Sequence, residues 1–289
     1  MRLRSLLFVP GDRPDRMEKA LGLGADAIIL DLEDSVAAPA KAEARRHVEH
    51  FLKSHRDANL WVRINPLEDW NDGDGPDPDG DWLKDLEAVA AARPSGIVLP
   101  KAEGGQMVDR LSRRLSEFGN DKSRIIAIAT ETPTAMFRLA SYIYAQRLVA
   151  LTWGAEDLPA AIGASTSREE DGRYTPPYEL ARSLCLFGAA AAGVTAIETV
   201  YPAFRDLEGL AAYAARGRRD GFTGMMAIHP AQVPVINQAF TPSEAEVAHA
   251  RAVVAAFEAS PGAGALSLDG KMIDRPHLVQ AQRTLAAAC

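Results

Sequence analysis

The sequence contains little cysteine and no long apolar segment. Cys185 and Cys289 are its two cysteines and lie far apart, which excludes a disulfide framework and a paired-cysteine zinc site. No apolar run reaches the ~18 residues of a membrane-spanning helix. The first run ends at Pro10 after about five residues, short of the ~7–15 in the apolar core of a signal peptide. We therefore expect a reduced, cytoplasmic chain that does not contact membranes.

Positive charge is also in deficit. The chain has 32 Lys and Arg against 39 Asp and Glu, a formal net charge of −7. Proteins that bind nucleic acid usually carry a basic surface, so this balance argues against a nucleic-acid partner. It does not exclude small anionic substrates, because a single local arginine can bind a carboxylate.

Short apolar runs recur along the chain, and Ala-rich amphipathic stretches such as 41–54 and 209–219 lie between them. The runs are continuous rather than alternating, which is typical of parallel strands covered on both faces. Eight strands with intervening helices predict a (β/α)8 TIM barrel of the α/β class. A doubly wound open sheet is the alternative, and no G-x-G-x-x-G after the first run supports it. The runs span residues 5–11, 26–34, 60–66, 96–101, 124–131, 147–154, 195–202 and 224–230.

The last thirty residues do not follow this pattern. A Pro/Gly linker opens the segment 260–289, and the next stretch reads as a hairpin with Asp269 and Gly270 at its turn. A closing helix with Pro276 in its first turn follows. We therefore expect a barrel over residues 1–259 and a C-terminal hairpin-plus-helix appendage over 260–289, acting as a lid or a swapped segment.

Polar residues close most of the apolar runs. In a (β/α)8 barrel the carboxyl ends of the strands meet at one mouth, where the chemistry takes place. Each residue alone is compatible with a helix cap or a rim ion pair, but several converging on one rim indicate a site. They are Asp31, Glu33, Asp34, Arg63, Asn65, Lys101, Glu131, Glu156, Asp157, Glu198, Tyr201 and His229.

Two of these acids close neighbouring strands. Glu131 ends the fifth run, and Glu156 and Asp157 follow the sixth. Neighbouring strands lie ~4.8 Å apart, so Glu131 and one of the other two would repel each other unless a cation lay between them. Two carboxylates with water and substrate oxygens suit Mg²⁺, and the lack of a His/Cys cluster disfavours zinc. A general acid/base pair, as in glycoside hydrolysis, is the alternative.

Arg63 lies within an apolar strand, where an unpaired charge would be very costly. It either pairs with an internal acid such as Glu33 or keeps its planar fork for a ligand carboxylate. A metal beside an arginine fork would suit a 2-keto acid.

Eight ordered motifs extend this interpretation over nearly the whole chain: RSLLFVPG, DAIILDLEDSV, K-x-E-A-R, WVRINP, TETPTAMF, WGAEDLPAAIG, AIHPAQ and GKMID-x-P. Together they resemble the citrate lyase beta subunit-like family of the HpcH/HpaI aldolase superfamily. Its stand-alone relatives include malyl-CoA and citramalyl-CoA lyases and malyl-CoA thioesterases. The resemblance implies a (β/α)8 barrel, a Mg²⁺ cofactor, and carbon–carbon cleavage or formation between an acyl-thioester enolate and a 2-keto acid.

The resemblance also assigns roles to individual residues. Glu131 and Asp157 match metal ligands, Arg63 matches the arginine that binds the substrate carboxylate, and Asp274 matches the catalytic acid/base. Glu33 and Asp34 match an acidic pair near the metal waters. Backbone amides of Gly154 and Ala155 are candidate donors to the keto acid. Contacts to the CoA portion or the thioester arm are implied for Phe8, Pro10, Asp12, Lys19, Lys41, Ile228 and His229.

The implied function is Mg²⁺-dependent cleavage of a 3-hydroxyacyl-CoA to a 2-keto acid and an acyl-CoA, with possible thioesterase activity. One alternative is a citrate lyase beta subunit that cleaves a citryl-acyl carrier protein to oxaloacetate and acetyl-acyl carrier protein within a complex. A second is a non-catalytic ligand-binding relative. The resemblance further implies a homo-oligomer, commonly a trimer, in which the tail covers a neighbouring mouth.

Overall fold

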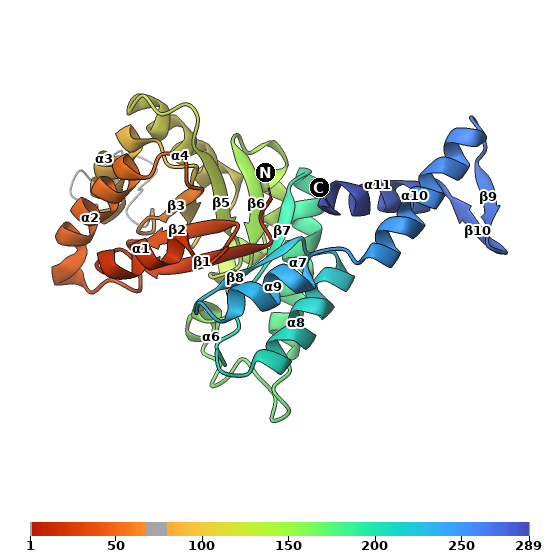
Figure 1. Cartoon of the computed structure of the whole chain (residues 1–289). Helices are drawn as coiled ribbons and strands as arrows, with labels where there is room; N and C mark the ends of the chain where they lie inside the picture. The colour runs from red at the N-terminus through yellow and green to blue at the C-terminus, as the bar shows by residue number, and fades with distance from the viewer. Residues whose placement is uncertain (1, 68–79, 289) are drawn as a thin grey trace. The chain divides into compact units, whose positions relative to one another are not determined.

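The computed structural model describes residues 2–67 and 80–288 (Figure 1). The chain forms two compact units. One spans Leu3–Asn237, and the other joins Met1–Arg2 to Gln238–Cys289.

The first unit is a closed barrel of eight parallel strands, arranged in chain order with β1 paired to β8. Each predicted apolar run contains one strand, so the predicted (β/α)8 fold is confirmed. The strands are β1 (Ser5–Pro10), β2 (Ala27–Asp31), β3 (Leu60–Arg63), β4 (Gly96–Leu99), β5 (Arg124–Ile128), β6 (Leu148–Thr152), β7 (Thr195–Glu198) and β8 (Gly224–Ala227).

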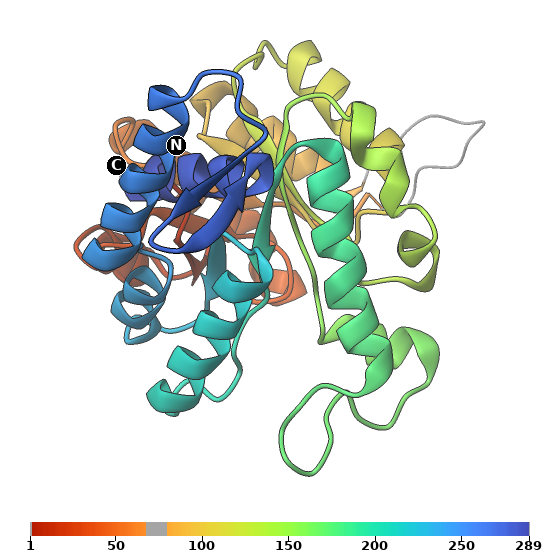
Figure 2. The ribbon, with the colours of Figure 1, turned by 90° about the vertical axis from the view of Figure 1, so that its right-hand side faces the viewer.

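Helices lie outside the barrel, as α7 and α8 do in Figure 2. They are α1 (Pro14–Leu21), α2 (Lys41–Ser54), α3 (Asp81–Val89), α4 (Gly105–Glu117), α5 (Pro133–Met136), α6 (Asp157–Ile162), α7 (Pro176–Ala192), α8 (Leu207–Asp220) and α9 (Gln232–Ala239), with 3₁₀ turns at Ala38–Ala40, Ala90–Ala92 and Leu139–Tyr144. Within the described ranges, no helix has both the length and the apolar character needed to span a bilayer.

Apolar side chains from all eight strands fill the barrel interior. The ring of Trp61 lies against Gly96 on the neighbouring strand, where a Cβ atom would come within 2.1 Å of it. Glycine is therefore required there for the largest core side chain to fit. The buried cluster consists of Leu6, Ala27, Ile29, Trp61, Val98, Ile126, Ile128, Ala150, Ile197 and Met226.

The C-terminal unit contains α10 (Glu244–Ala259), the hairpin of β9 (Ala265–Leu268) and β10 (Lys271–Asp274), and α11 (Arg275–Ala288). Asp269 and Gly270 both have positive φ, 50° and 76°, as a two-residue type I′ hairpin turn requires. The predicted hairpin and closing helix are therefore confirmed. Helix α10 packs against α11, so this compact unit begins at Gln238 rather than at residue 260. The lid or swap role of 260–289 stays a prediction.

Candidate active site

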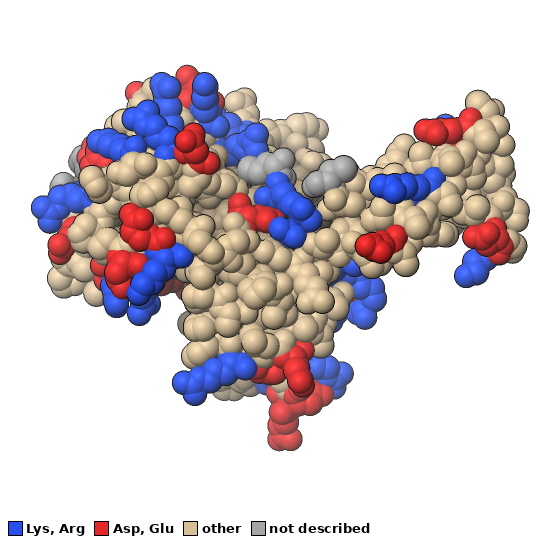
Figure 3. Space-filling model, in the orientation of Figure 1, with Lys and Arg blue, Asp and Glu red and all other residues tan. Residues whose placement is uncertain are grey.

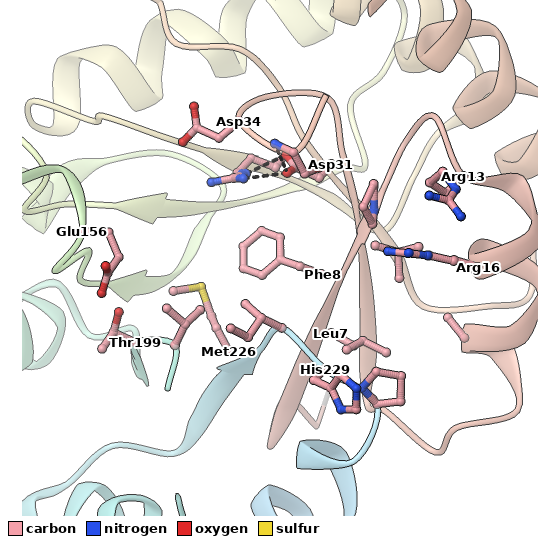
Figure 4. A pocket seen from close by; sticks show the side chains of 18 of the residues that line it. Leu7, Phe8, Arg13, Arg16, Asp31, Asp34, Glu156, Thr199, Met226 and His229 are labelled. Carbon is pink, nitrogen blue, oxygen red and sulfur yellow. Dashed lines mark hydrogen bonds and ion pairs between the residues drawn. The ribbon is translucent and has the colours of Figure 1, made fainter. Parts of the chain in front are cut away.

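A cavity of about 800 Å³ opens at the carboxyl ends of the barrel strands (Figure 4). The strand-end side chains meet there because all eight strands run in the same direction. Most of the predicted site residues line it: Phe8, Pro10, Lys19, Asp34, Arg63, Glu131, Gly154, Ala155, Asp157, Ile228 and His229.

Arg63 is held by two acids of β2 and the loop after it. Its Nε and Nη2 donate to the two carboxylate oxygens of Asp31 at 2.7 and 2.6 Å, and Nη1 lies 2.7 Å from Oε2 of Glu33. Burial raises the pKa of Asp31, but the hydrogen bonds and charge of Arg63 outweigh it and hold that pKa below its usual value. Internal pairing, one of the two alternatives for Arg63, is therefore present. A guanidinium has five N–H groups. Two bond Asp31 and a third faces Glu33, so two remain for a ligand.

Glu33 lies behind the cavity wall and is buried. Its Oε1 accepts a hydrogen bond from Nζ of Lys101 at 2.7 Å. The contact of Oε2 with Arg63 is an ion pair by distance but lacks hydrogen-bond geometry, so this buried oxygen has no hydrogen-bond donor in the described part of the chain. Burial raises the pKa of Glu33, against the opposing charges of Arg63 and Lys101.

Lys101 contacts three acids of the site, although the sequence predicted only that it ends the fourth run. Its backbone N–H donates to Oε2 of Glu131 at 2.6 Å, and its Nζ lies 3.8 Å from Oδ1 of Asp157, in addition to its contact with Glu33. Burial lowers the pKa of Lys101, but the hydrogen bond to Glu33 and the charges of Glu33, Asp34 and Asp157 raise it above its usual value.

Glu131 is 6% exposed and packs against the backbone of Gly154. A Cβ at position 154 would lie 2.6 Å from Cγ and 2.9 Å from Oε1 of Glu131. Burial is the main cause that raises the pKa of Glu131 to about 8, and the negative charges of Glu33 and Asp157 add to it. In the absence of a cation, this carboxyl is only partly ionised at neutral pH.

The donor set at this point fits a divalent cation with oxygen ligands. Within residues 2–67 and 80–288, no group of three or more His, Cys, Asp or Glu is arranged to enclose a metal. Arg63 is paired with Asp31 and Lys101 with Glu33. Of the other acids that line the cavity, Glu131 is buried, and the charge of Asp157 acts on it. Two carboxylates with room for water and substrate oxygens are the usual protein contribution to a Mg²⁺ site.

One side of the cavity has mostly basic side chains. Arg13, before α1, and Arg16 and Lys19, on α1, line it together with Asp15, which lies 3.5 Å from Arg13. Figure 4 shows Arg13 and Arg16 on one side of Phe8, with Glu156 and Asp34 on the other. Lys19 was predicted at this position, whereas Arg13 and Arg16 were missed, although their three-residue spacing places them near one helix face. On the molecular face in Figure 3, by contrast, Lys and Arg are interspersed with Asp and Glu.

Two predicted contacts have a different role in the structure. The ammonium of Lys41 donates to the carbonyls of Leu32 and Glu33 and to Oδ1 of Asn65, at 2.8, 3.1 and 2.6 Å. These bonds use all three of its donors, so Lys41 anchors the end of β2 and does not line the cavity. The N–H of Gly154 donates to Thr130 at 3.2 Å, which leaves the amide of Ala155 as the remaining candidate donor to a substrate.

Asp12 also does not line this cavity. Asp274 belongs to the C-terminal unit, at the end of β10, and its Oδ1 lies 2.5 Å from Nδ1 of His277. Its predicted role as an acid/base stays a prediction.

Glu198 is a strand-end acid that serves the fold instead of the cavity. It is fully buried and accepts hydrogen bonds from the Trp153 indole, the Arg182 guanidinium and the Tyr213 hydroxyl, at 2.5, 2.8 and 3.0 Å. Its side chain therefore joins β7 to α7 and α8.

Comparisons with known proteins agree with this geometry. The model of the HpcH/HpaI aldolase/citrate lyase family matches residues 4–230. The chain is similar to (3S)-malyl-CoA thioesterase from Cereibacter sphaeroides strain KD131, with 35% identity over 293 residues that cover 99% of this chain and 94% of that protein. It is also similar to the citrate lyase subunit beta-like protein of Mycobacterium tuberculosis, with 36% identity over 283 residues, 98% of this chain and 94% of that protein. A crystal structure of the M. tuberculosis protein CitE with magnesium, acetoacetate and coenzyme A aligns with a TM-score of 0.80 and 36% identity, covering 99% of this chain and 97% of that one.

Proposed function

The chain belongs to the HpcH/HpaI aldolase/citrate lyase family, and on that premise we propose that it is a Mg²⁺-dependent lyase. Its substrate would be a 3-hydroxyacyl-CoA of the malyl-CoA or citramalyl-CoA type, and its products a 2-keto acid and an acyl-CoA. The observation that carries the proposal is the charge pairing in the cavity. Arg63 and Lys101 have close hydrogen bonds to Asp31 and Glu33, whereas the negative charges of Glu131 and Asp157 act on each other in the same cavity and would be offset by a further cation.

Glu131 and Asp157 would hold the Mg²⁺, with water and substrate oxygens completing its ligands. When bound, the metal supplies Lewis-acid polarisation of the keto oxygen and stabilises the alkoxide of the 3-hydroxyacyl substrate. The similar M. tuberculosis CitE was crystallised with magnesium, which supports this choice of cation.

The keto-acid end of the substrate would lie against Arg63. The two N–H groups that Asp31 and Glu33 leave free on its guanidinium suit a carboxylate. The amide of Ala155, which lines the same cavity, could add a further donor.

The CoA portion would extend along the basic side of the cavity. Arg13, Arg16 and Lys19 supply positive charge near the mouth, where the phosphates of a nucleotide-containing carrier would be favourable. The similar M. tuberculosis CitE was crystallised with coenzyme A, which supports CoA as the carrier.

Cleavage requires removal of the 3-hydroxyl proton and protonation of the leaving enolate. Asp274 is our candidate for this proton transfer. It would act when the C-terminal unit covers a mouth, either that of its own barrel or that of a neighbouring subunit in a homo-oligomer such as a trimer. We favour the neighbouring subunit.

Hydrolysis is the second candidate activity, and the similarity to a (3S)-malyl-CoA thioesterase favours it. If water attacks the thioester carbonyl in the same pocket, the products are free CoA and the hydroxy acid. A third possibility, cleavage of an acyl-carrier-protein thioester within a complex, would make the isolated chain inactive on CoA thioesters.

One assay separates these activities. The purified chain is incubated with malyl-CoA and citramalyl-CoA in the presence of Mg²⁺ or EDTA, and free thiol, acyl-CoA and 2-keto acid are each quantified. A lyase gives equal amounts of keto acid and acyl-CoA, and a thioesterase gives free CoA without keto acid. If neither thioester is consumed, or if EDTA has no effect, the proposed function is wrong.

A further inference from the structure

The backbone N–H and the side-chain ammonium of Lys101 both face acids of the candidate metal site. The backbone N–H holds Glu131, and Nζ lies 2.7 Å from Glu33 and 3.8 Å from Asp157. We propose that the Lys101 ammonium is an internal counter-cation that competes with the divalent metal for Asp157 and thereby weakens metal binding. This inference rests on the proposed function, because it assumes that Glu131 and Asp157 bind the metal.

The backbone at position 101 indicates that the lysine side chain is needed. Lys101 has φ of 48°, in the left-handed region that glycine adopts without strain. A non-glycine residue there costs on the order of 1 kcal/mol, and such residues tend to occur at functional sites. Glycine would keep the N–H that binds Glu131 and relieve the strain. The feature that glycine would lose is the ammonium.

Electrostatic repulsion determines whether the Lys101 ammonium strengthens or weakens metal binding. The ammonium is within ion-pair distance of Asp157, so a divalent cation bound to that carboxylate would lie only a few ångströms from it. Repulsion between the two cations opposes metal binding. Lys101 does not line the cavity, so it acts through Asp157 and Glu33 as a positioning residue rather than a catalytic one. If the ammonium only oriented the acids, its removal would weaken metal binding.

The test measures metal affinity directly. Mn²⁺ replaces Mg²⁺ as the probe. The full-length chain is titrated with Mn²⁺, and electron paramagnetic resonance measures the concentration of free Mn²⁺. We expect Lys101→Met to bind Mn²⁺ more tightly than wild type, on the order of tenfold, while its lyase activity falls. Lys101→Arg, which keeps the charge, should stay within about threefold of wild type in affinity.

Arg93→Met is the matched control. Arg93 also has positive φ, of 53°, and is exposed, with its Nη2 3.5 Å from the carbonyl of Gly119. Like Lys101→Met, Arg93→Met removes one positive charge at a residue with left-handed backbone, but it does so outside the cavity. It should therefore leave Mn²⁺ affinity unchanged.

A double variant covers the case in which Lys101→Met fails to fold because the buried Oε1 of Glu33 loses its donor. Lys101→Met/Glu33→Gln removes both charges of the pair, so its affinity should lie within about threefold of wild type, whereas Glu33→Gln alone should bind Mn²⁺ more weakly. Unchanged or weaker binding by a folded Lys101→Met overturns the inference, as does equal binding by Glu33→Gln and the double variant. A wild-type chain that binds no Mn²⁺ overturns the proposed metal site itself.

Discussion

The guanidinium of Arg63 and the carboxylate of Asp31 form a two-point hydrogen-bonded pair, with distances of 2.7 and 2.6 Å. The register of the sheet produces it, because Asp31 on β2 pairs directly with Arg63 on β3. Asp31 is 1% exposed, so the pair also fixes the position of the guanidinium on the cavity wall. Arg63 therefore has a structural role in addition to its proposed role in binding the keto acid.

We expect Arg63→Lys to lose both roles. An ammonium keeps the charge but cannot form the planar fork, so the free energy of unfolding should fall by about 1–3 kcal/mol, less than the ~3–5 kcal/mol for removing one partner of a buried pair. The KM for the thioester or the keto acid should rise at least about tenfold. Urea unfolding and steady-state kinetics measure the two effects.

Arg182→Lys is the control for this change. Arg182 is a second buried arginine, which donates to Glu198 and Asp220 away from the cavity. The Arg182→Lys variant should lose about as much free energy of unfolding as Arg63→Lys, while its KM stays unchanged. If Arg63→Lys loses stability and keeps full activity in its folded fraction, Arg63 is purely structural.

The pKa of about 8 for Glu131 predicts how the stability of the metal-free protein depends on pH. Between the unfolded value of about 4.5 and 8, the folded state holds this proton more tightly than the unfolded state. The stability contributed by Glu131 should therefore be present below pH ~4.5 and be lost as pH rises to about 8, by on the order of 5 kcal/mol. Thermal unfolding in EDTA across this range measures it.

Mg²⁺ should reverse this loss, because it binds the ionised carboxylate. The increase in Tm on adding Mg²⁺ should be larger at pH 8.5 than at pH 6. Glu131→Gln should flatten the dependence on pH, abolish the Mg²⁺ response and lower activity by at least about a hundredfold. Full activity of this variant, or of the wild type in EDTA, would contradict the metal assignment.

Gly154→Ala should displace Glu131. The new methyl would come within 2.6 Å of its Cγ, closer than two carbon atoms can approach, so the carboxylate must move. We expect the Mg²⁺ concentration for half-maximal activity to rise about tenfold or more. Gly188→Ala is the control, because a Cβ there meets its neighbours at an ordinary 3.5 Å. If Gly154→Ala has a wild-type Mg²⁺ response, Glu131 does not hold the metal in this position.

Asp274 is tested by complementation. Asp274→Asn and Asp157→Asn should each lose nearly all activity. If the tail serves a neighbouring subunit, mixed oligomers of the two should recover up to roughly a quarter of wild-type activity, because some sites then combine an intact tail with an intact metal centre. Differently tagged chains are co-expressed and the mixed species isolated. No recovery in confirmed mixed oligomers would mean that Asp274 acts in its own subunit or not at all.

The features predicted correctly from the sequence are those with local causes. Continuous apolar runs indicate covered parallel strands, and Asp269–Gly270 indicates a hairpin because both residues tolerate positive φ. The missed features depend on long-range contacts. The pairing of Asp31 with Arg63 depends on strand register. The role of Lys101 depends on carboxylates that come from three other segments of the chain. Helix α10 is assigned to the C-terminal unit by its packing on α11, which the Pro/Gly linker does not indicate.

The 2.6 Å hydrogen bond from the Lys101 amide to Glu131 makes this amide a spectroscopic reporter. A backbone proton so close to a charged oxygen is strongly deshielded, and it becomes less so when the oxygen is protonated or shares its charge with a metal. In a ¹⁵N-labelled chain, one amide resonance would therefore report titration and metal occupancy together. Both could then be followed in the wild-type enzyme, with every catalytic side chain in place.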